Sequence, residues 1–203
     1  MTEIRHIVFD GGRVLVHYDP HQAYHHLLPI AAERETFLRD VCSTEWNIEQ
    51  DRGRSWEDAE AEAIARHPDK HELIRAFRKN WHLMVSHEYP ESIAILRGLI
   101  ANGHDVTLLT NFASDTFREA QRRFPALAES RGVTVSGEVR LIKPDPAIYE
   151  HHTRSFAPTP SATLFFDDSP KNIEAARNHG WNAELFTSAA QMRDDLGRYG
   201  ISV

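Results

Sequence analysis

The chain has 203 residues, a net charge of −7 with histidine neutral, and a hydrophobic share of 41%. This acidic balance argues against a nucleic-acid-binding protein, because such proteins carry a basic face, and the longest apolar runs are too short to cross a membrane. The single cysteine, Cys42, excludes an internal disulfide, and the first residues lack the basic-then-apolar order of a secretory signal, so we expect a cytoplasmic protein.

Residues 4–10 predict a buried parallel strand that ends at Asp10. The run is short, rich in β-branched and aromatic side chains, and followed directly by Gly11 and Gly12. Open α/β sheets bind their ligands at the carboxyl ends of strands, where Asp10 would lie. The two glycines let the backbone turn tightly and approach a ligand. The alternative is that Asp10 only begins a turn, as aspartate often does.

Residues 18–88 predict helices and no strand. Asp19 and Pro20 are placed like the N-cap and first residue of a helix, and Ser55 with Asp58 marks another helix start. Apolar residues recur at helical spacing over residues 22–30, 32–42, 56–66 and 71–84. A segment of about 70 residues is too long for an ordinary βα loop, so we expect a helical lid above the carboxyl edge of the sheet.

Strands alternate with helices from residue 90 onward. The predicted strands cover residues 105–110, 132–136, 162–167 and 183–186, and the predicted helices cover residues 90–101, 114–124, 146–153, 170–179 and 189–196. This alternation indicates an α/β fold, in which a parallel sheet is covered by helices on both faces.

Polar residues follow four of the predicted strands. They are Asp10 after the first strand, Thr110 and Asn111 after the second, Lys143 beyond the third, and Asp167 with Asp168 at the end of the fourth. Each has an ordinary explanation by itself, because threonine and asparagine form turns, lysine is usually solvated, and aspartate caps helices. Their joint position at the ends of apolar strands favours one shared site.

This set of side chains suits the transfer of a phosphoryl group. A carboxylate can attack phosphorus, and a magnesium ion held by Asp10 and one of the two adjacent aspartates would offset the charge repulsion. Thr110 and backbone N–H groups can bind phosphoryl oxygens, while Lys143 stabilises the nucleophile and the transferred group. Asn172 follows in the first turn of a helix, where it can hold a metal-bound water or orient Asp168.

With these motifs, the chain resembles the haloacid dehalogenase superfamily. The four motifs of the superfamily occur in order as Phe9-Asp10-Gly11-Gly12-Arg13-Val14-Leu15, Leu109-Thr110-Asn111, Lys143-Pro144-Asp145, and Phe166-Asp167-Asp168 through Asn172. The resemblance covers the whole chain. It implies a Rossmann-like three-layer core at residues 1–17 and 89–203, with an all-helical cap at residues 18–88 inserted between the first two motifs.

The resemblance also implies magnesium and an aspartyl-phosphate intermediate. Asp10 would be the nucleophile and first metal ligand, and the backbone carbonyl of Gly12 and the side chain of Asp168 would complete the protein ligands. Thr110 and Lys143 would bind phosphate, and Lys143 would also be catalytic. The remaining motif residues would have adjacent roles, Gly11, Gly12 and Asn111 at the phosphate and Asp167 and Asn172 in support.

One position departs from the pattern of the phosphatases in this superfamily. These phosphatases usually carry a second aspartate two residues after the nucleophile as general acid and base, and this chain has Gly12 there. A branch resembling sugar-phosphate phosphatases also carries glycine at this point. The proton would then come from water, from the substrate or from a neighbour such as His17. Arg13 is also unusual, and it either fills an anion pocket or points outward.

Neither the histidines nor the cysteine predict a site of their own. The pairs His25-His26 and His151-His152 are adjacent along the chain and do not share a helix face, so we expect surface or boundary residues rather than metal ligands. Cys42 is expected to be a small core residue, because nothing near it marks a paired base.

We therefore expect a magnesium-dependent phosphatase that acts on a small phosphorylated metabolite, such as a sugar phosphate, as a monomer or homodimer. A 2-haloacid dehalogenase is the first alternative, although Asp167 and Asp168 without a metal would repel a carboxylate substrate. A binding protein that kept the fold and lost its acid/base is the second.

The cap should decide which ester is bound. Five residues flank the Gly53 loop and could reach the site, namely Trp46, Asp51, Arg52, Arg54 and Trp56. For each of them alone, packing within the cap or solvation is the favoured interpretation.

Overall fold

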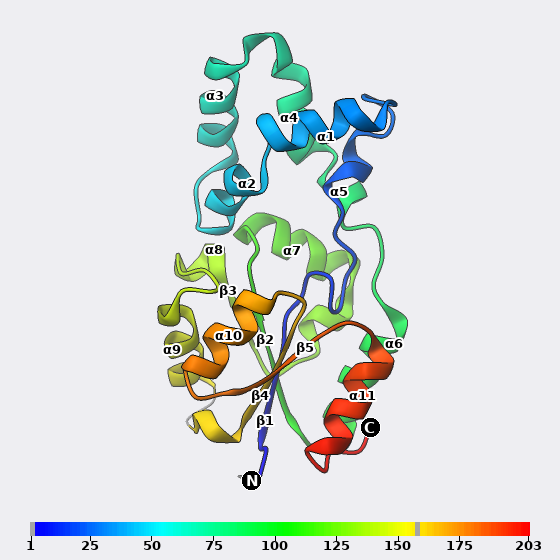
Figure 1. Cartoon of the computed structure of the whole chain (residues 1–203), viewed down its shortest axis with the longest axis vertical. Coiled ribbons are helices and arrows are strands. Elements are labelled where there is room, and N and C mark those ends of the chain that lie inside the picture. Colours follow the sequence, from blue (N-terminus) through cyan, green and yellow to red (C-terminus); the bar gives the residue numbers. More distant parts are fainter. Residues whose placement is uncertain (1–2, 157–158) are drawn as a thin grey trace.

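The computed structural model describes residues 3–156 and 159–203, and it is built around one parallel sheet (Figure 1). The five strands lie in the order β3-β2-β1-β4-β5, and every neighbouring pair is parallel. Their bounds are β1 His6–Phe9, β2 Asp105–Thr110, β3 Val133–Val135, β4 Thr163–Asp167 and β5 Asn182–Leu185. Each predicted strand overlaps an observed one, which confirms the α/β fold.

Helices cover both faces of the sheet and make three layers (Figure 1). One face packs against α6 (Pro90–Ala101), α7 (Ser114–Arg123) and α11 (Ala189–Arg198), and the other against α9 (Pro146–Ser155) and α10 (Pro170–Asn178). Side chains alternate along a strand, so Ile7 and Phe9 of β1 join the first core and Val8 joins the second. The Rossmann-like core is therefore a buried sheet between two helical layers.

The order of the strands places a reversal of direction beside β1. The chain runs outward from β1 to β2 and β3, then returns to β4 on the other side of β1. Phe9 lies opposite Phe166 in this pairing, and the backbone N–H of Asp10 donates to the Phe166 carbonyl at 2.9 Å. Ligands bind at such a reversal in open α/β sheets, and here Asp10 and Asp167 flank it.

Residues 18–88 form helices beyond the carboxyl ends of the strands, at the top of Figure 1. The elements are η1 (Pro20–Tyr24), α1 (Ala31–Asp40), α2 (Thr44–Asp51), α3 (Trp56–Arg66), η2 (Pro68–Lys70), α4 (His71–Lys79) and α5 (Trp81–Met84). Ser55 accepts a hydrogen bond from the Asp58 N–H, as its capping position predicted. We call this segment the helical region; its division from the core as a domain stays a prediction.

Two helix predictions in this region are wrong and one helix was missed. Of the predicted helix over residues 22–30, only residues 22–24 are helical, as the end of the 3₁₀ helix η1, and Pro29 disfavours a helical conformation at the residue before it. The predicted helix 71–84 breaks at Asn80, whose side-chain amide donates to the Ala23 carbonyl at 3.0 Å. Helix α2 follows Ser43, which accepts from the Trp46 N–H and could have signalled it.

The two connections between the core and the helical region run side by side. Val16 pairs with Glu88 in an antiparallel bridge, and the His17 N–H donates to the His87 carbonyl at 2.8 Å. The rings of His17 and His87 stack with centroids 4.7 Å apart. The chain thus leaves the core and re-enters it at one place.

A chain of buried hydrogen bonds links β1, β2 and β3 to helix α9. His6 bonds Thr107 at 2.8 Å, Thr107 bonds His152 at 2.9 Å, and His152 bonds Thr134 at 2.9 Å. The His6 Nδ1 atom lies 2.7 Å from Asp105 Oδ2. We call this the histidine–threonine chain. The expectation that His152 is a surface or boundary residue is wrong, because the side chain is fully buried in this network.

Three short helices complete the described elements, α8 (Ser136–Val139), η3 (Pro125–Ala128) and η4 (Pro160–Ala162). Helix α8 lies directly after β3 and was not predicted. None of the helices in the described part of the chain combines the length and the apolar character that a membrane span requires.

Candidate active site

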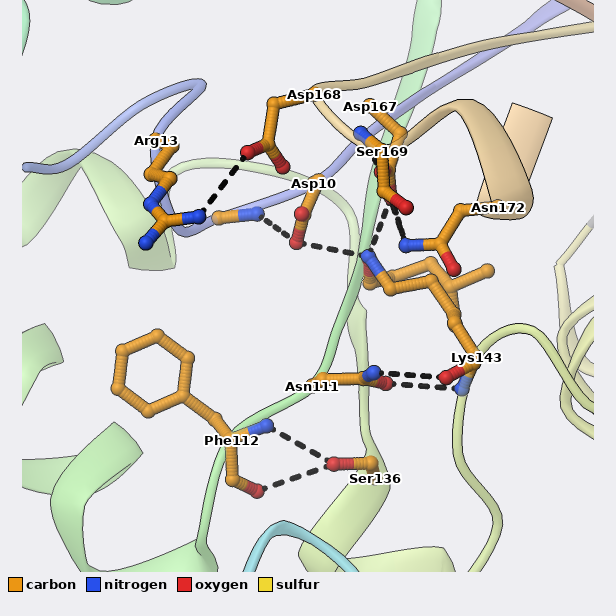
Figure 2. A network of polar contacts seen from close by, with 12 residues as sticks. Asp10, Arg13, Asn111, Phe112, Ser136, Lys143, Asp167, Asp168, Ser169 and Asn172 are labelled. Carbon is orange, nitrogen blue, oxygen red and sulfur yellow. Dashed lines mark hydrogen bonds and ion pairs between the residues drawn. The ribbon is translucent and has the colours of Figure 1, made fainter. Parts of the chain in front are cut away.

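Three aspartates from two neighbouring strands meet at the reversal point. Asp10 follows β1, Asp167 ends β4 and Asp168 is the next residue (Figure 2). One carboxylate oxygen of each lies within 4.8 Å of those of the other two. The sequence therefore correctly placed these side chains together.

Lys143 lies between two of these carboxylates and is almost completely buried. Its Nζ atom is 2.9 Å from Asp10 Oδ1 and 2.7 Å from Asp167 Oδ2, and it also donates to the Leu109 carbonyl at 3.0 Å (Figure 2). Burial by itself would lower the pKa of Lys143, but the two carboxylates outweigh it and raise the pKa above its usual value. The site therefore contains a permanent ammonium charge.

Asp167 is engaged by donors on every side. In addition to Lys143, it accepts from the Ser169 N–H at 2.8 Å and from the Asn172 side chain at 2.9 and 3.1 Å. Asn172, in the first turn of α10, therefore orients Asp167 and not Asp168 (Figure 2). Since its oxygens are occupied, Asp167 is suited to hold Lys143 in place, and Asp168 is the better placed of the two for a cation.

Thr110 ends β2 with a buried hydroxyl that has no partner among the described residues. Such an orphan is costly unless a ligand satisfies it. A Cβ atom on Gly11 would stand 3.0 Å from this hydroxyl, so only glycine leaves room beside it. Among the described residues, the Thr110 hydroxyl beside Gly11 is therefore a candidate donor to a ligand oxygen.

The loop after β2 is fixed by two sets of hydrogen bonds (Figure 2). The Asn111 side chain accepts from the Lys143 N–H at 2.9 Å and donates to the Lys143 carbonyl at 3.0 Å. The Phe112 N–H donates to the Ser136 hydroxyl at 2.9 Å. The Asn111 side chain therefore holds the segment of Lys143 in place through both its oxygen and its nitrogen.

Negative charge exceeds positive charge in this cluster. Burial raises the pKa of Asp10 to about 7, Lys143 opposes this shift, and Asp167 adds to it. Burial, followed by repulsion from Asp167, also raises the pKa of Asp168. Lys143 is the buried cation, while Arg13 reaches Asp168 only at 3.7 Å with a half-exposed side chain. Carboxylates in this balance suit a hard divalent cation.

Arg13 and His17 differ in their relation to the site. Arg13 has a left-handed backbone, with φ of 58°, and its guanidinium lies over the Tyr18 ring and near Asp168. His17 bonds the Tyr89 hydroxyl at 3.1 Å and does not line the cavity of the site. Arg13 therefore faces an acidic group rather than an anion pocket, and His17 has no direct access to a reacting ester.

A cavity of about 870 Å³ extends from Asp10 and Asp168 towards the helical region. Asp51 and Trp56, from the expected cap loop, line it. Trp46 is packed in the core of the helical region, and Arg54 binds Gln50 and Glu62 there. The cavity also includes side chains that the sequence analysis did not single out, among them His21, Arg39, Asn47 and Lys171.

Comparison with known families and proteins identifies relatives of this chain. The model of a family described as haloacid dehalogenase-like hydrolase matches residues 4–180. Phosphatase MT3486 of Mycobacterium tuberculosis is 29% identical over 111 residues, which is 54% of this chain and 51% of that protein. The chain therefore matches only about half the length of this curated relative.

Solved structures share the fold at low identity. A predicted HAD-like family hydrolase from Porphyromonas gingivalis has a TM-score of 0.77 and 20% identity, covering 97% of this chain and 98% of its own. The HAD family enzyme bt-2542 of Bacteroides thetaiotaomicron, in complex with magnesium and inorganic phosphate, has a TM-score of 0.71 and 21% identity over 91% and 94%. L-2-haloacid dehalogenase from Xanthobacter autotrophicus has a TM-score of 0.64 and 16% identity over 98% and 85%.

Proposed function

Because this chain belongs to the haloacid dehalogenase-like hydrolases, we propose that it is a magnesium-dependent phosphatase of small phosphorylated metabolites that acts through an aspartyl-phosphate intermediate. The observation that carries the proposal is the buried Asp10–Lys143 pair, 2.9 Å apart, beside the unpaired hydroxyl of Thr110. The phosphatase relative and the magnesium–phosphate complex of a structural neighbour support it.

In the proposed reaction, Asp10 attacks the phosphorus of the ester, the bond between phosphorus and the ester oxygen breaks, and the alcohol leaves. Its Oδ1 atom is already bonded to Lys143 and to the Gly11 N–H, so Oδ2 is the atom left to form the new bond. Lys143 offsets the charge that both anions bring, and the Thr110 hydroxyl donates to a phosphoryl oxygen. Water then attacks the aspartyl phosphate and releases inorganic phosphate.

The residues present fit a magnesium ion. Asp168 and Asp10 would hold it together with the backbone carbonyl of Gly12, which lines the same cavity. When bound, the ion would neutralise the charge of the transferred group and draw its oxygens towards Asp10. The excess negative charge of the three aspartates supports this assignment.

A dehalogenase shares the attacking carboxylate, and a structural neighbour with this chemistry has the same fold. The three converging aspartates favour the phosphatase, because without a cation they would repel a carboxylate substrate. The sugar-phosphate branch, a cytoplasmic location and a monomeric or homodimeric state stay predictions.

The test is hydrolysis of a panel of phosphate esters with magnesium by the purified protein. We expect Asp10→Asn to lower kcat/KM by roughly 10⁴-fold or more, because it removes the nucleophile. Addition of a chelator should abolish the activity and added magnesium should restore it. Asp194→Asn, an exposed change on α11, is the matched control and should leave the activity unchanged.

Three outcomes would contradict the proposal. Activity that survives Asp10→Asn would exclude the nucleophile assignment. Halide release from 2-haloacids in the presence of chelator would identify a dehalogenase. Binding of magnesium and inorganic phosphate without turnover of any ester would identify a binding protein.

A further inference from the structure

The proposed phosphatase reaction needs a proton donor that the first motif does not supply. Gly12 has no side chain at the position where a general acid would stand, and a Cβ atom there would have nothing within 4 Å. His17 is bonded to Tyr89 and lies outside the cavity. The following inference rests on the proposed function and concerns the side of the cavity formed by the helical region.

Asp51 is the last residue of α2 and lines the same cavity as Asp10. The chain turns sharply after it at Gly53, whose φ of 101° suits glycine. A Cβ atom on Gly53 would lie 3.1 Å from the Gly137 carbonyl of α8, so the turn touches the core. Asp51 is thereby held where the helical region meets the core.

The turn that carries Asp51 is braced from both sides. Arg54 donates to the Gln50 side chain at 2.8 Å and to the Trp46 carbonyl at 2.9 Å, and these bonds fix the end of α2. On the core side, a Cβ atom on Gly137 would lie 2.8 Å from the Phe112 carbonyl. The end of α2 therefore packs, through α8, against the loop that begins with Thr110 and Asn111.

The surroundings of Asp51 favour its protonated form. Burial raises the pKa of Asp51 to about 7, a backbone hydrogen bond from Ala113 opposes the shift, and the charge of Asp10 adds to it. Tyr18 also lines the cavity, but burial and the charge of Asp51 raise its pKa. A carboxyl group that titrates close to neutral pH is well matched to general acid and base catalysis.

We propose that Asp51 is the acid/base catalyst of this phosphatase, supplied by the helical region in place of the side chain that Gly12 lacks. As the Asp10 oxygen bonds phosphorus and the phosphorus–oxygen bond of the ester breaks, Asp51 donates its proton to the leaving oxygen and becomes a carboxylate. Asp51 then takes a proton from the attacking water, as the aspartyl phosphate splits into inorganic phosphate and free Asp10. The two steps together return the enzyme to its starting state, with Asp10 free and Asp51 protonated.

The test compares esters with good and poor leaving groups in Asp51→Asn. An alkyl phosphate needs its leaving oxygen protonated, so we expect its kcat/KM to fall roughly 10²–10⁴-fold. For para-nitrophenyl phosphate, whose leaving group departs without a proton, kcat/KM should change less than about tenfold. Release of nitrophenolate should begin with a burst of one equivalent per enzyme, because water now lacks its base, and intact mass spectrometry should detect the accumulated phosphoenzyme.

Two further variants separate this role from a structural one. Asp51→Glu keeps a proton donor and should recover part of the alkyl phosphate activity. Glu49→Gln makes the same chemical change on an exposed residue of α2 outside the cavity and should behave as wild type. The thermal unfolding midpoint of each variant reports whether it folds as the wild type does.

The inference and the proposed function fail in different ways. If Asp51→Asn lowers both kcat/KM values by the same factor and no phosphoenzyme accumulates, the acid/base role is excluded while the phosphatase stands. If the wild-type protein hydrolyses no ester, both the acid/base role of Asp51 and the proposed phosphatase function are excluded. Equal activity of Asp51→Asn and the wild type on alkyl phosphates also excludes the role.

Discussion

Two buried polar clusters lie on the same sheet, and they differ in whether their polar atoms are satisfied. In the histidine–threonine chain, each hydroxyl and ring nitrogen has a partner at 2.7–2.9 Å. At the active-site end, the Thr110 hydroxyl has no partner within the described residues, and three carboxylates face one buried ammonium.

The hydrogen bonds of the histidine–threonine chain run in one direction. Burial lowers the pKa values of His6 and His152, so we assign both rings as neutral. With the His6 Nδ1–H donating to Asp105, its Nε2 then accepts from Thr107, Thr107 accepts from His152 Nε2–H, and His152 Nδ1 accepts from Thr134. A neutral, fully bonded cluster stabilises the fold, whereas unpaired atoms and excess charge indicate a place for a ligand.

Removal of Lys143 should give the largest effect on stability. Lys143→Met leaves Asp10 and Asp167 buried without their cation, so we expect the free energy of unfolding to fall by about 3–5 kcal/mol. Magnesium should restore more stability to this variant than to the wild type. Denaturant unfolding with and without magnesium measures both, with Lys79→Met, at an exposed position of α4 outside the cavity, as the control. If the free energy of unfolding falls no further in Lys143→Met than in the control, Lys143 is not needed to balance the charges of Asp10 and Asp167.

Two threonines of β2 offer a matched comparison between the clusters. Thr107→Val removes the partner of two buried ring nitrogens and should cost about 1–3 kcal/mol. Thr110→Val removes an unpaired hydroxyl and should be neutral or stabilising by up to about 1 kcal/mol, while it weakens phosphate binding. Unfolding and calorimetric titration with phosphate test the pair. Equal destabilisation by both variants would show that the two hydroxyls do not differ in their contribution to stability.

The histidine–threonine chain should also make the stability depend on pH. Because burial lowers the folded pKa values of His6 and His152, the unfolded chain binds more protons below its histidine pKa of about 6.5. Stability is therefore complete above that pH and is lost as the pH falls, by up to about 1.4 kcal/mol per pH unit for each proton. His152→Gln keeps hydrogen-bonding groups without taking up the proton, so its unfolding free energy should change less between pH 7 and pH 5. A steeper dependence in the variant would contradict the neutral assignment.

The ends of the strands could be predicted because local signals mark them. Asp10 and Asp167 each follow a short apolar run and precede turn residues, and parallel strands bring their carboxyl ends to one edge. Gly11, Thr110, Lys143 and Asp168 were placed at the site for the same reason. The capping pair Ser55 and Asp58 gave the start of α3 correctly.

The remaining features depend on partners that are distant in the sequence. The amide of Asn172 could reach either of two adjacent carboxylates, and the backbone path after β4 directs it to Asp167. His152 is bonded in the interior to Thr107, which lies 45 residues away in the sequence. The polar neighbours of His152 on α9 give no sign of this contact. Asp51 was identified only as a flank of the Gly53 loop, because its placement needs the contact between that loop and α8.

The bridge between Val16 and Glu88 places the entry and the exit of the helical region side by side. Because its two ends are neighbours, the helical region is a closed loop on the core. The entropy of closing such a loop depends only weakly on its length. A different insertion grafted between these residues would leave β1 and α6 in register. Under the proposed function, such an exchange would replace residues that contact the ester while Asp10 keeps its surroundings, and in this chain it would also remove the proposed proton donor, Asp51.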